Sequence, residues 1–246
     1  MLLIFFYFYY YYMKFQIPAN ISSSNTNNFI SPKIKFISTN KNNHTVISTA
    51  RIKTNEIILI ETPCATLYGE LDIDRGLQTI QKYMLLADHP GIQSLYPREN
   101  NSNTFPRTPM IKQIHKIITT LPDKYNKLHT FFSKYNKTEI EFYYAKYLFN
   151  AFEGYSYGPL TLPLLAKFNH SCDSNVTFQF DVSRGVMIVR ATQEILPNQE
   201  LFNSYLYNKT IPNHWDYLLE HYGFSCNCKI PTPTPAKHLK KCIKLK

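Results

Sequence analysis

The stretch FNHSCDSN, at Phe168–Asn175, places an amide, an imidazole, a hydroxyl and a thiol next to one another. An apolar segment precedes it, and a segment typical of a strand follows it. Each residue alone has an ordinary structural explanation, because an Asn-His pair is common in turns and a single cysteine packs well in a core. The stretch is therefore either a surface loop with a stray cysteine or the floor of an active site.

Composition limits the kind of protein that surrounds this stretch. The chain has 246 residues, of which 44% are hydrophobic and 15% aromatic, so it can build one large domain or two small ones. This composition excludes a disordered polymer. The net charge of +10 permits nucleic acid or an acidic protein face as a partner, and a lysine-rich surface also explains it. Basic residues cluster only in the tail, PAKHLKKCIKLK at Pro235–Lys246.

Cysteine usage and the N-terminus bear on the compartment. The chain has five cysteines, an odd number, and no credible secretory signal, so intracellular thiols fit better than a disulfide framework. Nuclear and cytoplasmic locations both stay open. The apolar start MLLIFFYFYYYYM ends at Met13, short of the ~20 residues of a membrane span. It also lacks the basic start of a signal peptide. We expect no membrane span, and a poorly ordered extension rather than a weak anchor.

Short strands are predicted toward both ends of the chain. The segments IKFIST, TVIST and EIILIE, within 34–61, are each bounded by Asn or Thr. Val176–Phe180 and Val186–Val189 flank Ser183-Arg-Gly185 and predict a hairpin. ELFNSYLY, at 200–207, predicts one more short strand.

Helical spacing dominates the middle of the chain, through 78–86 and 111–121. Thr138–Glu141 fits a capping box that opens a helix to about Phe152, and His214–His221 predicts another helix. Strands at both ends of a helical block, without regular alternation, indicate an α+β fold rather than a doubly wound parallel sheet.

Four separated segments are informative when they are taken in order. They are NHTVISTARIKTNEIILIETP at 43–63, KYLFNAF at 146–152, FNHSCDSN with the later NQELFNSY at 198–205, and LLEHYGFSCNC at 218–228. In this order and spacing they resemble the SET-domain protein methyltransferases, most closely the SET-and-MYND branch, although no cysteine cluster corresponds to a MYND zinc finger. The resemblance covers about 34–229, and NHSC followed by SY and YGFSCNC is its most specific part.

The resemblance implies an architecture. It implies small β-sheets around a pseudo-knot, in which the C-terminal segment threads under a loop beside NHSC. A SET domain would span 34–230, with a variable helical insertion at about 70–137 and a post-SET-like end at 222–230. Residues 1–33 would form an apolar, Asn/Ser-rich extension, and 231–246 a basic tail.

The resemblance also implies an activity. The chain would be a protein-lysine N-methyltransferase that uses S-adenosylmethionine and acts on histone or other protein lysines. Tyr205 takes the position of the catalytic tyrosine and would line the lysine channel together with Tyr222. The residues that would bind the cofactor are Asn43, His44, Thr45, Asn150, Asn169, His170 and Phe224. A helix-buried asparagine such as Asn150 often only ties backbone segments together.

These residue types suit methyl transfer from a sulfonium to a neutral amine. Free lysine has a pKa of about 10.4 and is mostly protonated at neutral pH. A sulfonium and an apolar aromatic channel both disfavour the ammonium form and lower that pKa. A tyrosine hydroxyl can orient the amine toward the methyl group. Asn169 can donate and accept, as the amino and carboxylate groups of the cofactor require.

The resemblance leaves a zinc site open. Tetrahedral zinc needs four ligands, and Cys172, Cys226 and Cys228 occupy three positions of the family's site. Pro231 stands where the fourth cysteine would be, so Cys242 or His238 from the tail would have to complete the site. Otherwise it is vacant or completed by water.

Glycine positions of the family carry other residues here. Asn55 and Asn198 replace two glycines, and we expect both to tolerate positive φ. The G-x-G cofactor turn is replaced by Asn43-His44-Thr45, and a β-branched Thr45 suits positive φ poorly. The Thr45 side chain would also crowd the cofactor. Thr45 and the missing fourth cysteine therefore leave a second hypothesis, a catalytically inactive SET fold that binds peptide or chromatin. The basic tail leaves a third, a weak contact with nucleic acid.

Overall fold

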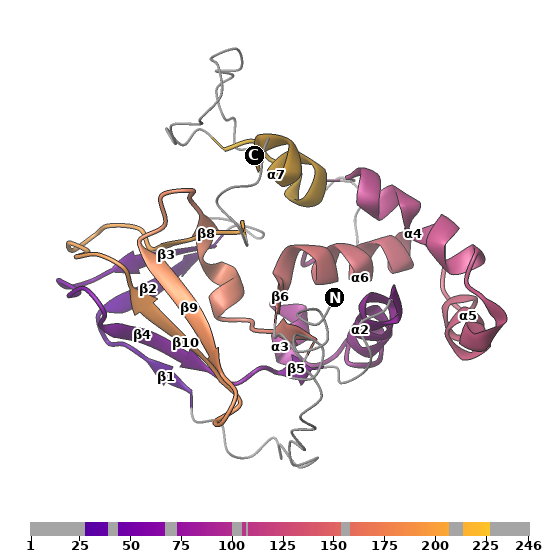
Figure 1. Cartoon of the computed structure of the whole chain (residues 1–246), viewed down its shortest axis with the longest axis horizontal. Helices are drawn as coiled ribbons and strands as arrows, with labels where there is room; N and C mark the ends of the chain where they lie inside the picture. Colours follow the sequence, from indigo (N-terminus) through magenta and orange to yellow (C-terminus); the bar gives the residue numbers. More distant parts are fainter. Residues whose placement is uncertain are drawn as a thin grey trace, which may run out of the picture.

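The computed structural model describes residues 28–38, 44–66, 73–99, 105–106, 108–153, 158–206 and 214–226. Strands gather at one end and the helices of the middle block at the other, with helix α6 (Lys137–Asn150) between them (Figure 1). This arrangement confirms the predicted α+β class. Within the described part of the chain, no helix is long and apolar enough to cross a membrane. The apolar start at 1–27 lies outside the described residues.

The main sheet is antiparallel and contains the predicted hairpin. Its strand order is β1 (Phe29–Ile30), β4 (Ile57–Glu61), β10 (Val186–Ala191) and β9 (Val176–Asp181). Gly185 takes a φ of 65° in the β9–β10 turn, a conformation that glycine adopts without a steric cost. β1 lies before residue 34, where the sequence places the start of the SET domain.

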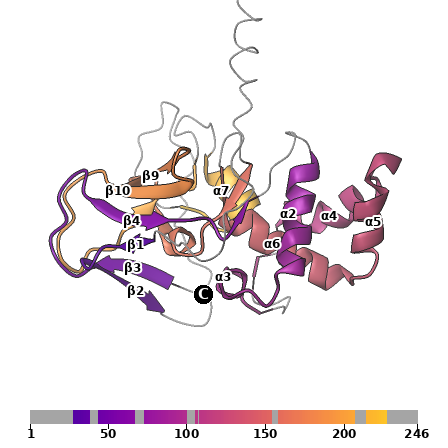
Figure 2. The same ribbon diagram turned by 90° about the horizontal axis from the view of Figure 1, so that it is seen from below.

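A separate antiparallel pair is formed by β2 (Ile34–Ser38) and β3 (His44–Ser48) (Figure 2). Thr45 pairs with Ile37 and does not have a positive φ. The prediction that His44 and Thr45 form a turn is therefore wrong, because both are strand residues. β-branched side chains fit a strand well, so the strain expected at Thr45 does not arise. Asn43 lies outside the described residues.

The two asparagines that replace glycines do take left-handed conformations. The φ angle is 66° at Asn55 and 64° at Asn198, which confirms the prediction. The Asn198 N–H donates to the Ser48 carbonyl at 2.9 Å, so this turn joins the 198–205 segment to β3. Asparagine is one of the few non-glycine residues that visits this region routinely.

We expect Asn198→Ala to destabilise the protein by about 1 kcal/mol, whereas Asn198→Gly is close to neutral. Alanine lacks the local hydrogen-bonding capacity of asparagine and has a Cβ, whereas glycine has no steric objection to positive φ. Urea denaturation of both variants measures the difference. Gln193→Ala, at an exposed position of ordinary φ, serves as the control. Equal stability of the alanine and glycine variants would contradict the conformational explanation.

The helical block contains the predicted helices and shorter ones that periodicity missed. Its elements are α2 (Ile73–Leu85), α3 (Pro90–Gln93), α4 (Pro109–Thr119), the 3-10 helix η2 (Asp123–Tyr125) and α5 (Asn126–Phe132). α2, α4 and α5 pack with α6 around a second core, which includes the fully buried Ile80, Ile111 and Ala145. Ile92 of α3 belongs to a smaller cluster with Tyr83 and Leu95. α3, η2 and α5 have too few turns to show a helical repeat.

Helix α6 begins and ends earlier than predicted. Asn136 is the N-cap, and its side chain and that of Glu139 form the reciprocal capping box. The box predicted at Thr138–Glu141 is wrong, because the asparagine two residues earlier already accepts from the first turn. The helix stops at Asn150, since Ala151 starts strand β6 (Ala151–Glu153). β6 belongs to a small sheet with β7 (Pro159–Thr161) and β5 (Ala65–Thr66).

Candidate active site

Two very short parallel strands bring distant segments together. β8 (Asn169–His170) pairs with β11 (Phe202–Asn203), and the Ser171 N–H donates to the Asn203 carbonyl at 2.9 Å. Just before β11, the Leu201 N–H donates to the Val46 carbonyl of β3 at 2.8 Å. The strand predicted for ELFNSYLY is thus shorter than expected. FNHSCDSN is not a surface loop, because it lies between β3 and the segment that leads to Tyr205.

Buried anchors fix the start of FNHSCDSN. Phe168 is fully buried and packs edge-on against Phe36, with ring centroids 6.3 Å apart. The 3-10 helix η4 (Leu165–Lys167) comes immediately before it. The Glu61 carboxylate accepts from the Leu164 and Leu165 N–H groups at 2.7 and 2.8 Å, so it caps this helix.

Glu61 is a positioning residue that the sequence analysis missed. It is only 2% exposed, and burial raises its pKa to about 7, although the two backbone N–H donors oppose the shift. Its place at the end of the apolar segment EIILIE was the only signal of burial in the sequence. A carboxylate at the end of a strand usually faces solvent, so this signal was easy to miss.

Asn169 connects the three segments of the site. Its Nδ2 donates to the His44 carbonyl at 2.9 Å and to Glu200 Oε1 at 2.6 Å. Nothing among the described residues donates to its amide oxygen, so that oxygen can accept from a ligand. Glu200 is a second acidic residue that the sequence analysis missed, because nothing in NQELFNSY distinguishes it from an exposed strand residue.

His170 links the backbone at Tyr205 to a sulfur atom. Its Nδ1 accepts from the Tyr205 N–H at 3.0 Å, and its Nε2 lies 3.2 Å from Cys172 Sγ. A neutral imidazole that accepts at Nδ1 carries its proton on Nε2. His170 therefore donates toward the Cys172 sulfur and does not present a lone pair there.

Aromatic rings surround Tyr205. The ring centroid of Tyr205 lies 4.9 Å from that of Tyr222 and 6.2 Å from that of Phe224, and the last two are 6.3 Å apart. Phe149 of α6, which the sequence analysis did not single out, lies 6.3 Å from Tyr222. Tyr222 and Phe224 reach this place because Gly223, with a φ of 74°, ends helix α7 (His214–Tyr222).

Tyr205 and Tyr222 stay protonated and do not act as bases near neutral pH. The Tyr205 hydroxyl donates to the Phe168 carbonyl at 3.0 Å. Burial raises the pKa of Tyr205 well above its ordinary value, and the Glu200 charge adds to the shift. Burial also raises the pKa of Tyr222. Both hydroxyls therefore keep their protons across the neutral and mildly alkaline range.

Asn150, next to Phe149 at the end of α6, binds backbone carbonyls. It is 4% exposed, and its Nδ2 donates to the Tyr96 and Lys146 carbonyls at 2.5 and 2.7 Å. These are contacts of the kind that tie backbone segments together. The Lys146 ammonium likewise donates to the Ile92 and Leu95 carbonyls, so α6 holds the 92–96 segment in place.

The other predicted residues lie on β3. The His44 ring contacts the Arg98 guanidinium, and burial, followed by the Arg98 charge, lowers the His44 pKa. The Thr45 hydroxyl is buried without a hydrogen-bond partner in the described part of the chain. An unsatisfied buried hydroxyl is costly, so a group outside the described residues, or a ligand, would satisfy it.

Two cysteines fit the geometry of a zinc site. The Sγ atoms of Cys172 and Cys226 are 3.7 Å apart, and Cys172 is 2% exposed. Zn–S bonds of about 2.3 Å at tetrahedral angles place two sulfurs about 3.8 Å apart. His170 completes a cluster of donor atoms within 4.8 Å of one another, but its protonated Nε2 makes it a hydrogen-bond donor to sulfur. Cys228, His238 and Cys242 lie outside the described residues.

Comparisons with known proteins agree with this geometry. A family model described as "SET domain" matches residues 43–206. A protein of Acanthamoeba polyphaga mimivirus named "Putative SET domain-containing protein L678" is 31% identical over 194 residues, which cover 75% of this chain and 71% of that protein.

Named lysine methyltransferases match over a shorter region. N-lysine methyltransferase SMYD2-A of Danio rerio is 36% identical over 91 residues, which cover 36% of this chain and 20% of that protein. SMYD2 of Mus musculus is 36% identical over 115 residues, which cover 42% of this chain and 25% of that protein. Among solved structures, Rubisco LSMT bound to sinefungin and monomethyllysine is 13% identical, with a TM-score of 0.48 over 80% of this chain and 53% of that chain.

Proposed function

The chain belongs to the SET-domain family, and on this premise we propose that it is a protein-lysine N-methyltransferase that uses S-adenosylmethionine. The observation that carries the proposal is the meeting of Asn169 and His170 with the aromatic rings around Tyr205. The SMYD2 relatives are named N-lysine methyltransferases, which supports the same reaction. The substrate would be a lysine side chain of a protein, and histones remain a prediction from the family resemblance.

The residues present fit the cofactor. The amide oxygen of Asn169 would accept from its ammonium group, and the unpartnered Thr45 hydroxyl lies one residue from the His44 carbonyl that Asn169 binds. Phe224, beside His170, offers an aromatic face to the adenine. When bound, the cofactor supplies a methyl group on a sulfonium.

The chain itself would prepare the lysine. The rings of Tyr205, Tyr222 and Phe224 would exclude water from the amine, and this desolvation disfavours the ammonium form. The Tyr205 hydroxyl donates its proton to the Phe168 carbonyl at 3.0 Å, so the hydroxyl oxygen and the carbonyl oxygen can both accept from the N–H groups of the neutral amine and leave its lone pair free for the methyl group. The proton leaves the ammonium for solvent before the methyl group is transferred.

The hypothesis of an inactive SET fold loses one of its supports. It rested on Thr45 and on the missing fourth cysteine, and the strain expected at Thr45 does not arise, because Thr45 lies in a strand. The nucleic-acid hypothesis rests on the tail at 235–246, which lies outside the described residues.

Cofactor binding tests the proposal directly. We expect the chain to bind S-adenosylhomocysteine with micromolar affinity, about −8 kcal/mol, in titration calorimetry. Asn169→Ala should weaken this binding by at least about tenfold, because it removes the amide oxygen and releases the His44 carbonyl. Asn126→Ala, at an exposed position of α5, is the matched control. A folded protein that releases no heat and shows no thermal shift would overturn the proposal.

We further propose that Cys172 and Cys226 bind zinc together with ligands from 227–246. Protein purified without chelators should then hold about one zinc ion per chain, and Cys172→Ser should lose it. Native mass spectrometry measures the occupancy. Cys64→Ser is the control, because burial raises the pKa of that thiol to about 12 and keeps it protonated. Retention of zinc by the Cys172 variant would refute the assignment.

A further inference from the structure

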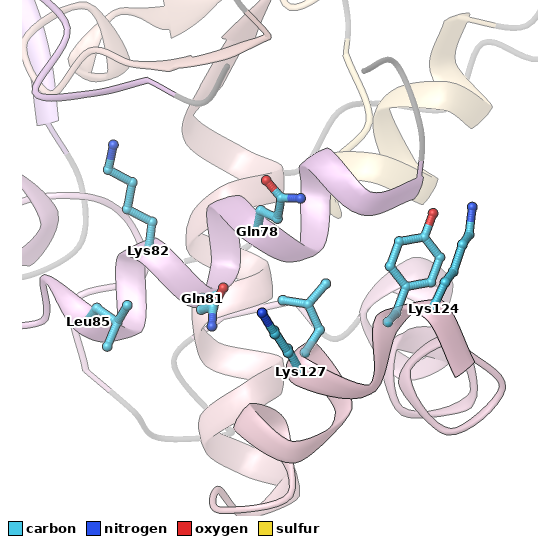
Figure 3. Close-up of a pocket in the computed structure, with 8 residues that line it drawn as sticks. Gln78, Gln81, Lys82, Leu85, Lys124 and Lys127 are labelled. Carbon is cyan, nitrogen blue, oxygen red and sulfur yellow. The ribbon is translucent and has the colours of Figure 1, made fainter. Parts of the chain in front are cut away.

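A hollow of about 610 Å³ between α2 and α5 is lined by three lysines, but it does not concentrate their charge. The Lys82 ammonium points away from Lys124 and Lys127 (Figure 3). The Lys124 ammonium lies over the Tyr125 ring, 4.6 Å from its centroid. Positive charges act on one another more strongly beside the candidate active site, around Arg98.

The half-buried Arg98 carries a positive charge that acts on three basic side chains. Burial is the first cause and this charge the second cause of a lowered pKa at His44, Lys146 and Lys167. The Glu61 charge opposes the shift at Lys167, but the Glu61 carboxylate already accepts from two backbone N–H groups. The cations therefore repel one another, and a carboxylate from a ligand would relieve that repulsion.

The Arg98 guanidinium has no acidic partner in the part of the chain that the structure describes. None of the ion pairs found there includes it. It contacts Nε2 of the His44 ring, and this nitrogen has to be unprotonated because arginine only donates. One neutral acceptor leaves the charge of Arg98 and most of its N–H donors free. A guanidinium binds a carboxylate through two parallel hydrogen bonds, so a carboxylate is the ligand group that fits.

Helix α6 fixes the segment that carries Arg98. The Lys146 ammonium donates to the Leu95 carbonyl at 2.8 Å. Asn150 Nδ2 donates to the Tyr96 carbonyl at 2.5 Å, two residues before the arginine. Both donors are buried on α6. The backbone at Arg98 is therefore held in place before any ligand arrives, which lowers the entropic cost of binding.

His44 connects this charge to the place where the cofactor would bind. Its carbonyl accepts from Asn169 Nδ2 at 2.9 Å, and its ring contacts Arg98. The proposed function places the cofactor's ammonium group at the amide oxygen of Asn169. The carboxylate of an α-amino acid is attached to the same carbon as the ammonium, so it lies directly beside it. A cation is needed on this side of the site, and Arg98 supplies it.

We propose that Arg98 binds the carboxylate of the cofactor's amino-acid part. The inference rests on the proposed function, because it assumes that S-adenosylmethionine binds beside Asn169. Arg98 lies in the helical block, outside the four segments that carry the resemblance to the family. The helical block then contributes directly to cofactor binding, and its role is not limited to packing against the sheets.

Titration calorimetry with S-adenosylhomocysteine and with its decarboxylated analogue tests the proposal. The analogue keeps the adenosine and the ammonium group and lacks only the carboxylate. Arg98→Gln should weaken the binding of S-adenosylhomocysteine by at least about tenfold, because a charge-assisted pair is lost. It should not weaken the binding of the analogue, which gives Arg98 no carboxylate to hold. Arg98→Lys keeps the charge without the planar fork and should fall between the two.

Arg184→Gln is the matched control, because it removes an exposed arginine from the β9–β10 turn and should leave the binding of both ligands unchanged. Weaker binding that is confined to the ligand with a carboxylate supports the proposal. Equal weakening of both ligands by Arg98→Gln shows that Arg98 acts only through the local structure and overturns the proposal, as does unchanged binding of both. If the unmodified, folded chain binds neither ligand, the proposed function fails together with this inference.

Discussion

Replacing Tyr205 by phenylalanine is expected to lower the rate of methyl transfer by about 10²-fold while cofactor affinity stays within about twofold. The variant keeps the ring that packs against Tyr222 and Phe224 and loses only the hydroxyl. That hydroxyl, next to the Phe168 carbonyl, is the group that would orient the amine. A transfer assay with labelled S-adenosylmethionine, on any protein shown to accept the methyl group, measures the rate.

The pH dependence of this variant distinguishes orientation from base catalysis. Burial raises the pKa of Tyr205, so its hydroxyl is protonated at pH 7 and at pH 9 alike. The factor by which Tyr205→Phe slows the reaction should therefore be the same at both values. A factor that grows with pH would show that the tyrosinate acts as a base.

A matched control separates a local effect from a general loss of stability. Tyr143→Phe removes a partly buried hydroxyl from α6 in the helical block. It should leave the rate unchanged. Undiminished transfer by Tyr205→Phe would contradict the role assigned to Tyr205 and would weaken the proposed function with it.

Local sequence patterns predicted much of the fold because the longer elements obey simple rules. The apolar spacing of α4 follows directly from burial of one face. The continuous apolar run of β4 fits a strand with buried residues on both faces. Asn55 and Asn198 were predicted at positive φ because they stand where the family resemblance has glycines, and both adopt it. Where two local signals competed, as at the start of α6, the earlier cap residue Asn136 formed the box.

The centre of the candidate site could not be predicted in this way. β8 and β11 have two residues each, too few to show any period, so only the resemblance to a family joined Asn169 to the Tyr205 segment. Glu61 and Glu200 were missed because a buried carboxylate and an exposed one look alike in a sequence. The turn proposed at His44 was wrong because pairing with β2 extends β3 through it.

Glu61 carries the second large prediction, which concerns the stability of the fold beneath the NHSC segment. Its pKa is raised from 4.5 to about 7 in the folded protein. The folded state therefore binds a proton more tightly than the unfolded state, and the protein loses stability as pH rises from 4.5 to 7. For this 2%-exposed side chain the loss amounts to about 3 kcal/mol.

Glu61→Gln removes the ionisation and keeps one acceptor oxygen, so one of the Leu164 and Leu165 N–H groups loses its partner at every pH. The stability of this variant relative to the unmodified chain should nevertheless rise by up to about 3 kcal/mol between pH 5 and pH 8. Urea denaturation at both pH values measures this difference. Burial lowers the pKa of Lys146 to about 7, so Lys146 adds stability as pH rises from 7 toward 10.5. This contribution is the same in the variant and in the unmodified chain, so it cancels in the difference between their stabilities.

Two further variants decide whether Glu61 acts as a cap. Glu61→Ala leaves both N–H donors without an acceptor and should cost about 3 kcal/mol at pH 5, where the loss of the cap is not offset by relief of a buried charge. Glu56→Gln, just before the same strand, is the control, because the Lys33 ammonium lowers the pKa of Glu56 and its charge is constant from pH 5 to pH 8. If Glu61→Gln instead loses stability relative to the unmodified chain as pH rises, then the buried carboxylate is stabilised as an anion, and η4 is held by a charged cap rather than by a neutral one.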